Sequence, residues 1–174
     1  MTTKGRILSK SVSSPDVVVM GLGNLLMQDE GVGIHALRSL QEQYQFEPDV
    51  QLIDGGTSGM DLLPYFRPDS YVLLIDAMNF SETPGEIGRV EGDDIMARLN
   101  TKMSVHHLGL SDLLSTVKLL DIEPADLVLI GVQPETIELF LGLSPKLEAV
   151  IPKIVQYAVE QLEKWGVKVS PLEF

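Results

Sequence analysis

The chain has 174 residues, no cysteine and a formal net charge of −12, and 44% of its residues are hydrophobic. This length and composition fit one domain with a substantial apolar core. The absence of cysteine excludes disulfides, a thiol nucleophile and a thiolate metal site. The negative charge argues against a nucleic-acid partner, because phosphates require a basic protein face.

Residues 1–16 contain basic and hydroxyl side chains but no apolar stretch. We therefore expect a flexible N-terminal extension rather than a secretory signal. No apolar run reaches the roughly 18 residues that a membrane-spanning helix needs. The sequence predicts a cytoplasmic protein without a membrane partner, whose residues 17–174 form a single domain.

An apolar, β-branched run at residues 17–20 predicts a buried strand. Glycines then break the chain, and two carboxylates precede a helix predicted over residues 34–44. We interpret Asp29 as a residue that favours the helix N-terminus, which attracts negative charge. Glu30 is the functional candidate in this loop, and His35 on the helix is interpreted as structural.

Two further strand–loop units follow the first. Residues 50–53 predict a second strand, which leads into a glycine-rich loop with Asp54 at its start and then a short helix over residues 60–66. Residues 71–75 form an unbroken apolar run, typical of a central strand covered on both faces, and Asp76 ends it. Successive units of this kind predict parallel crossovers and an α/β sheet.

The second half of the chain has a different pattern. We expect an edge strand over residues 85–90, a short helix over 93–99, a histidine-containing loop over 104–110, a helix over 111–120, a strand over 127–132 and a last helix over 146–164. Pro152 offers an alternative start for the last helix.

Polar residues collect at the predicted carboxyl ends of the strands. With the first and third strands adjacent, Glu30 and Asp76 would face one crevice, and His106 or His107 would approach it from the following loop. One imidazole and two carboxylates suit a borderline divalent ion better than magnesium or calcium, and three ligands leave a coordination position open. Asp54 either assists the chemistry or braces the glycine-rich loop.

Several familiar motifs are incomplete. The glycines at positions 21 and 23 lack the third glycine of a dinucleotide-binding fingerprint, because position 26 is leucine. There is no P-loop and no His-Glu-x-x-His pair. The segment around Ser58 lacks the glycine that a nucleophile elbow needs two residues after the serine.

Five segments, in order, resemble the signatures of the [NiFe]-hydrogenase maturation endopeptidases. They are GLGNLLMQDEGVG at residues 21–33, DGGTSGM at 54–60, Asp76 with the alanine after it, SVHHLGL at 104–110 and GVQPE at 131–135. The resemblance extends over about residues 17–165. It implies an α/β three-layer sandwich, in which a mostly parallel sheet of about five strands in the order 2-1-3-5-4 has one antiparallel strand and helices on both faces.

The resemblance also implies a peptidase of the aspartyl type that trims the C-terminal extension of the hydrogenase large-subunit precursor. Its metal-binding residues fall on Glu30, Asp76 and His106, which would grip nickel already held by the precursor. The site would accept other divalent metals, and the adjacent His107 leaves the choice of imidazole open. Asp54, Glu30 and Asp76 are the candidates for activating water.

Two functions from other classes remain as alternatives at this point. One is a non-catalytic nickel chaperone of the same assembly pathway, and the other is a nucleotide-binding domain that uses the glycines after the first strand. We expect a monomer, because the charge and the apolar core suffice for an isolated domain.

Overall fold

The computed structural model describes residues 14–101 and 105–173, which form an α/β domain of three layers. Its central sheet contains β1 (Val17–Leu22), β3 (Val50–Gly56), β4 (Tyr71–Ala77), β6 (Asp126–Val132) and β5 (Ile87–Glu91). The strands are ordered β3-β1-β4-β6-β5. All adjacent pairs are parallel except β5 with β6. The expected strand order, including its one antiparallel member, is confirmed.

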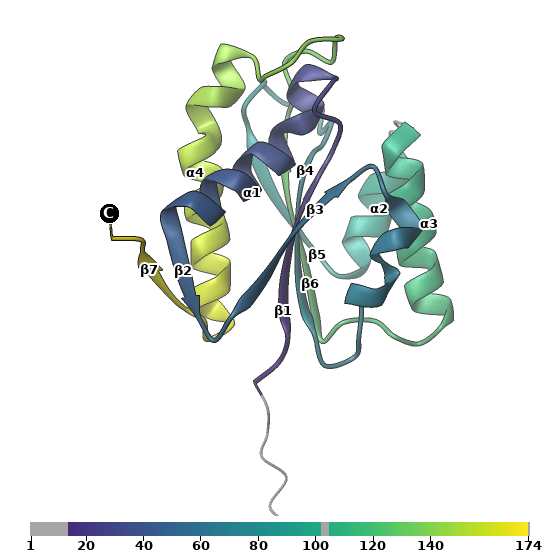
Figure 1. Ribbon diagram of the computed structural model, residues 1–174. Coiled ribbons are helices and arrows are strands. Elements are labelled where there is room, and N and C mark those ends of the chain that lie inside the picture. Colours follow the sequence, from purple (N-terminus) through teal and green to yellow (C-terminus); the bar gives the residue numbers. More distant parts are fainter. Residues whose placement is uncertain (1–13, 102–104, 174) are drawn as a thin grey trace, which may run out of the picture.

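Helices cover both faces of this sheet (Figure 1). One face carries α1 (Val32–Gln43) and α4 (Pro145–Lys164), and the other carries α2 (Asp93–Thr101), α3 (Val105–Leu119) and the 3₁₀ helix η2 (Gly59–Tyr65). A further 3₁₀ helix, η1 (Gln28–Gly31), directly precedes α1. None of the helices in the described part of the chain combines the length and the hydrophobicity of a membrane span.

The alternation of side chains along β1 explains why both faces are covered. Val17 and Val19 belong to the core beneath α1 and α4, whereas Val18 and Met20 belong to the core beneath η2, α2 and α3. All four are nearly inaccessible to solvent. A strand that is apolar at every position therefore lies in the middle layer, as its sequence predicts.

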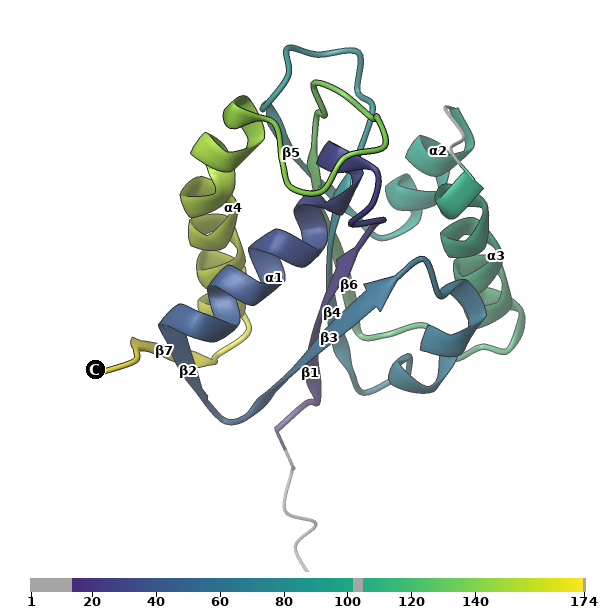
Figure 2. The ribbon, with the colours of Figure 1, turned by 45° about the horizontal axis from the view of Figure 1, so that its top comes forward.

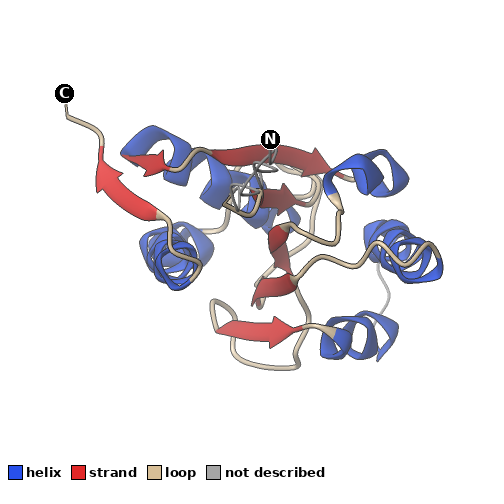
Figure 3. Ribbon diagram, turned by 90° about the horizontal axis from the view of Figure 1, so that it is seen from below, coloured by secondary structure: helices blue, strands red, loops and turns tan. Residues whose placement is uncertain are grey.

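Some predicted boundaries are wrong. Tyr44, expected at the end of the first helix, begins β2 (Tyr44–Glu47), which pairs with β7 (Lys168–Pro171) in a separate two-stranded sheet. That sheet lies at the side of the molecule that carries the C-terminus (Figure 3). Residues 60–66, expected to be an α-helix, lie mostly in the 3₁₀ helix η2, which contains Pro64. Proline lacks the N–H that an α-helical turn would need.

The last helix begins at Pro145, not at the alternative position Pro152, which lies inside it. Ser144 caps the helix, because its hydroxyl accepts a hydrogen bond from the backbone N–H of Leu147.

The predicted N-terminal extension, residues 1–16, lies outside the described residues except for its last three positions. Its flexibility therefore stays a prediction.

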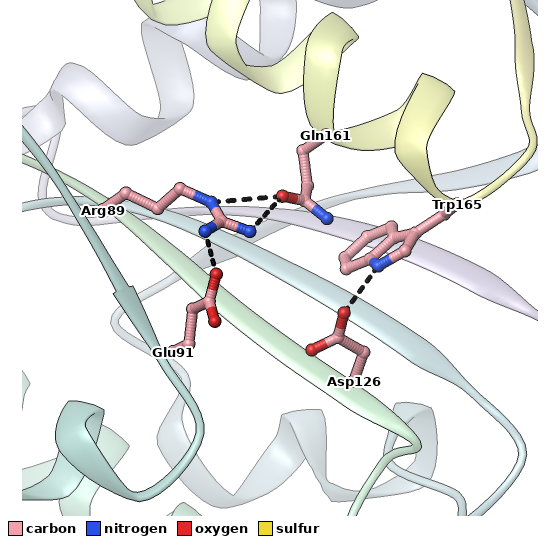
Figure 4. A network of polar contacts seen from close by, with 5 residues as sticks. All are labelled: Arg89, Glu91, Asp126, Gln161 and Trp165. Carbon is pink, nitrogen blue, oxygen red and sulfur yellow. Dashed lines mark hydrogen bonds and ion pairs between the residues drawn. The ribbon is translucent and has the colours of Figure 1, made fainter.

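Polar contacts connect α4 to the sheet beneath it (Figure 4). The guanidinium of Arg89, on β5, donates two hydrogen bonds to Oε1 of the buried Gln161, at 3.2 and 2.6 Å, and pairs with Glu91. The indole N–H of Trp165 donates to Asp126 at the start of β6, at 2.8 Å. These contacts hold the C-terminal end of α4 against the edge half of the sheet.

Candidate active site

Four parallel strands end at the same edge of the sheet, and the loops after them are linked to one another. The N–H of Gly23, after β1, donates to the carbonyl of Gly56 at the end of β3, at 2.9 Å. The buried Gln133, after β6, accepts a hydrogen bond at 2.7 Å from the N–H of Phe80 in the loop after β4. This edge, with the loops after β1 and β4, lies at the top of Figure 1.

Glu30 lies in η1, where the geometry of Gly23 brings the loop back onto itself. Gly23 has φ = +126°, and a Cβ atom there would lie 1.7 Å from the carbonyl oxygen of Glu30. Only glycine satisfies both conditions. The N–H of Glu30 donates to the carbonyl of Met27 at 3.1 Å, which completes the turn.

Asp76 lies near the end of β4 and is fully buried. Val72 and Leu74 belong to the core beneath α2 and α3, so strand alternation directs Asp76 toward the same face. η1 packs against β4. The elements that carry Glu30 and Asp76 are therefore in contact at the carboxyl edge.

The close approach of α1 to the sheet explains this contact. A Cβ atom at Gly33 would lie 2.0 Å from the carbonyl oxygen of Ile75 and 2.5 Å from that of Leu22. The first turn of α1 therefore sits on the backbone at the ends of β1 and β4. Any larger residue at position 33 would push the start of α1, and η1 before it, away from the ends of these strands.

Asp54 lies on the other face of the sheet. Its carboxylate is about half exposed and pairs with Arg38 of α1 at 3.5 Å. Leu52, two residues earlier, packs against the core beneath α1 and α4, as strand alternation requires. The structure thus does not bring Asp54 to the face toward which β4 directs Asp76.

His106 and His107 lie in the first turn of α3, not in a loop as expected, because this helix begins at Val105 rather than at Ser111. Gly109 therefore lies inside the helix, where it is used for packing. A Cβ atom at Gly59 of η2 would lie 3.3 Å from the Cα of Gly109. The two backbones are therefore in contact, and α3 begins beside the loop that follows Asp54.

The side chains of residues 100–108 lie outside the described part of the structure. The two-carboxylate, one-histidine metal set, and the choice between His106 and His107, therefore stay predictions. Among the described residues no group of three His, Cys, Asp or Glu side chains is placed to hold a metal ion.

Asp29 has a structural role, but a different one from the helix-capping role expected. It is fully buried, and its carboxylate accepts hydrogen bonds from the N–H groups of Glu135, Thr136 and Ser144, and from the hydroxyl of Ser144. The four distances lie between 2.7 and 3.1 Å. Asp29 therefore holds the loop between β6 and α4 against the loop that carries Glu30 (Figure 2).

Gln133 is a second residue with a structural role at this edge. A glutamine by itself does not predict such a role. Its Oε1 accepts from Phe80, and also from the N–H of Glu82 at 3.4 Å. The only sequence signal is its position in the GVQPE segment at residues 131–135, immediately after a buried strand.

Comparisons with known proteins find similar sequences over most of the chain. A family model described as hydrogenase maturation protease matches residues 34–161. The hydrogenase expression/formation protein HupD of Thiocapsa roseopersicina is 38% identical over 157 residues, which are 89% of this chain and 71% of that protein. The hydrogenase 2 maturation protease of Escherichia coli K12 is 33% identical over 158 residues, 90% of this chain and 96% of the relative.

Solved structures show the same fold. The hydrogenase maturating endopeptidase HybD of E. coli superposes with a TM-score of 0.85 at 32% identity, covering 90% of this chain and 97% of the other. A [NiFe] hydrogenase maturation protease, HybD from Thermococcus kodakarensis, has a TM-score of 0.70 at 29% identity, covering 84% and 98%.

Proposed function

Because this chain belongs to the hydrogenase maturation protease family and is a peptidase, we propose that it cuts the C-terminal extension from the precursor of a [NiFe]-hydrogenase large subunit. We propose further that nickel already bound by the precursor is the feature it recognises. The family membership favours this function over a nickel chaperone or a nucleotide-binding domain. We expect the protein to act in the cytoplasm and as a monomer.

One observation carries the assignment of the site: the fully buried Asp76 lies near the end of the central strand β4, at the edge where η1, which carries Glu30, packs against that strand. A carboxylate in a low-dielectric setting attracts a divalent cation more strongly than one in water does. His106 lies in the first turn of α3, which covers the face toward which Asp76 is directed. Carboxylate and imidazole ligands together fit a borderline ion such as nickel.

In the proposed mechanism, Glu30, Asp76 and His106 bind the nickel that the precursor brings. This binding positions the scissile peptide beside a water molecule, and such positioning supplies about 7 to 11 kcal/mol at best. The water is activated either by the metal, which polarises the peptide carbonyl or acidifies the water, or by a carboxylate acting as general base.

Asp54 has a secondary place in this proposal. Its ion pair with Arg38 on the α1 face supports a bracing role for the glycine-rich loop. We expect its substitution to slow cleavage less than substitution of Asp76.

The test is to incubate the nickel-loaded precursor with the variants Glu30→Gln, Asp76→Asn and His106→Ala and to follow its mass over time. We expect each variant to process the precursor at least about 100-fold more slowly, since each loses one contact to the nickel. Processing by all three at the wild-type rate would contradict the site.

Three further variants sharpen the experiment. His107→Ala decides which imidazole acts, and we expect it to retain activity. Asp54→Asn tests the bracing role. Asp112→Asn alters an exposed carboxylate on the same helix as His106 and serves as the matched control.

A further inference from the structure

An exposed apolar surface lies beside the candidate site. Five large hydrophobic side chains from two loops have exposed fractions between 46% and 82%. We call this surface the apolar rim, and its members are Leu26, Ile137, Leu139, Phe140 and Leu141. Single exposed hydrophobic residues are ordinary, but a run of this kind typically marks an interaction site.

The two loops of the apolar rim are held together by their backbones. The N–H of Phe140 donates to the carbonyl of Leu26 at 3.0 Å, and the carbonyl of Phe140 accepts from Gln28 at 3.1 Å. The buried carboxylate of Asp29 adds four hydrogen bonds beneath them. The structure therefore presents these side chains to solvent on an ordered support.

The rim is continuous with the candidate site. Glu30 follows Leu26 by four residues, and the segment between them pairs with Phe140. In Figure 2 the green loop before α4 crosses the purple loop after β1 at the carboxyl edge of the sheet. A protein that reached Glu30 would meet the rim.

Charge limits what can bind there. Residues 17–37 and 119–145, which include both loops, contain no lysine or arginine. Glu135 and Glu138 are exposed within the second loop. A complementary partner therefore has an apolar segment with lysine or arginine beside it.

We propose that the apolar rim is the docking surface for the large-subunit precursor, which binds it through an apolar segment flanked by basic residues. This inference rests on the proposed function, since it takes the substrate of that site as the occupant. The rim supplies affinity for the folded body of the precursor, while the nickel contact positions the peptide to be cut.

The test compares two double variants in binding to nickel-loaded precursor, measured by biolayer interferometry. Leu139→Ser with Leu141→Ser removes two side chains of the rim. Leu119→Ser with Leu120→Ser removes two exposed leucines that follow one another at the far end of α3, and is the matched control. All four side chains are more than half exposed, so we expect both variants to fold.

We expect the rim variant to bind at least tenfold more weakly than wild type, and the control variant to bind as wild type does. Equal affinity of the rim variant and wild type would overturn the inference. A wild-type protein that does not bind the precursor would also overturn it. A third contrary result is a wild-type protein that sediments as a dimer and a rim variant that sediments as a monomer, since a second copy of the chain would then occupy the rim.

The mass of the precursor separates this inference from the proposed function. If wild type binds through the rim but the precursor is not shortened, the docking surface stands and the proposed cleavage fails. If the precursor is shortened at the same rate by the rim variant and binding is unchanged, the cleavage stands and the docking surface fails.

Discussion

The backbone N–H of Ser144 and its hydroxyl both donate to the carboxylate of Asp29, at 2.7 and 2.9 Å, although the two residues are 115 positions apart. Ser144 is also the N-cap of α4. The loop that carries Glu30 and the start of the last helix are thereby joined through one buried side chain. This connection determines how the carboxyl edge of the sheet is assembled.

Replacing Asp29 should therefore destabilise the whole domain. Asp29→Ala leaves buried donors without an acceptor, and we expect a loss of about 3 kcal/mol in the free energy of unfolding. That corresponds to a fall in Tm of roughly 6 to 12 °C for a chain of this size. Thermal denaturation followed by circular dichroism measures it. Glu42→Ala, which removes an exposed carboxylate of α1, should change the stability by less than about 0.5 kcal/mol.

Gly23→Ala should disturb the loop of Glu30 in two ways, by steric overlap of the new Cβ atom with the backbone and by strain of the positive φ angle. A Cβ atom there meets the carbonyl of Glu30 at 1.7 Å, whereas one at Gly166, which also has positive φ, meets no atom within 4 Å. We expect Gly166→Ala to cost about 1 kcal/mol and Gly23→Ala about 2 kcal/mol more. Urea denaturation of the two variants gives the comparison, and equal losses would contradict the overlap.

His35 should make the stability depend on pH. Burial lowers the pKa of its imidazole below the ordinary 6.5, with a further lowering by the nearby Arg38 and an opposing effect of Glu148 on α4. The unfolded chain therefore binds the proton more readily than the folded one, and the free energy of unfolding falls as the pH drops below about 6.5.

The measurement is urea denaturation of wild type and His35→Gln at several pH values between about 5 and 8. We expect the variant to lose less stability on acidification, because it lacks the imidazole whose pKa is lowered in the fold and is otherwise identical to the wild type. A steeper dependence in the variant would show that the charged form of His35 is favoured in the fold.

Trp165 and Asp126 should be energetically coupled through their 2.8 Å hydrogen bond. In a double-mutant cycle of Trp165→Phe and Asp126→Ala, we expect a coupling of about 1 kcal/mol. Circular dichroism is the readout, since the chain has one tryptophan. A second cycle with Glu123→Ala, which changes an exposed carboxylate of the preceding loop, should give a coupling near zero.

The central sheet could be predicted because its signals are local. Three runs are apolar at nearly every position: residues 17–20, 71–75 and 127–132. Such a run is typical of a strand covered on both faces, whereas a half-exposed strand alternates apolar and polar residues. The pair β2–β7 was missed because each strand has four residues and Tyr44 pairs with Pro171, far away in the chain. The predicted start of α3, at residue 111, is too late, because glycine is unfavourable inside a helix and the contact of Gly109 with Gly59 joins residues that are far apart in the chain.

The sequence by itself determined where the strands end, and so which acids lie at those ends or in the loops after them: Glu30, Asp54 and Asp76. Only the tertiary structure decided how they are sorted, with Asp54 turned to Arg38 on α1 and Asp76 buried on the side of α3. It also decided that Asp29 joins two loops. The physical reason is that periodicity records burial along one segment, whereas the choice of partner depends on helices packing across a sheet whose strands are distant in the chain.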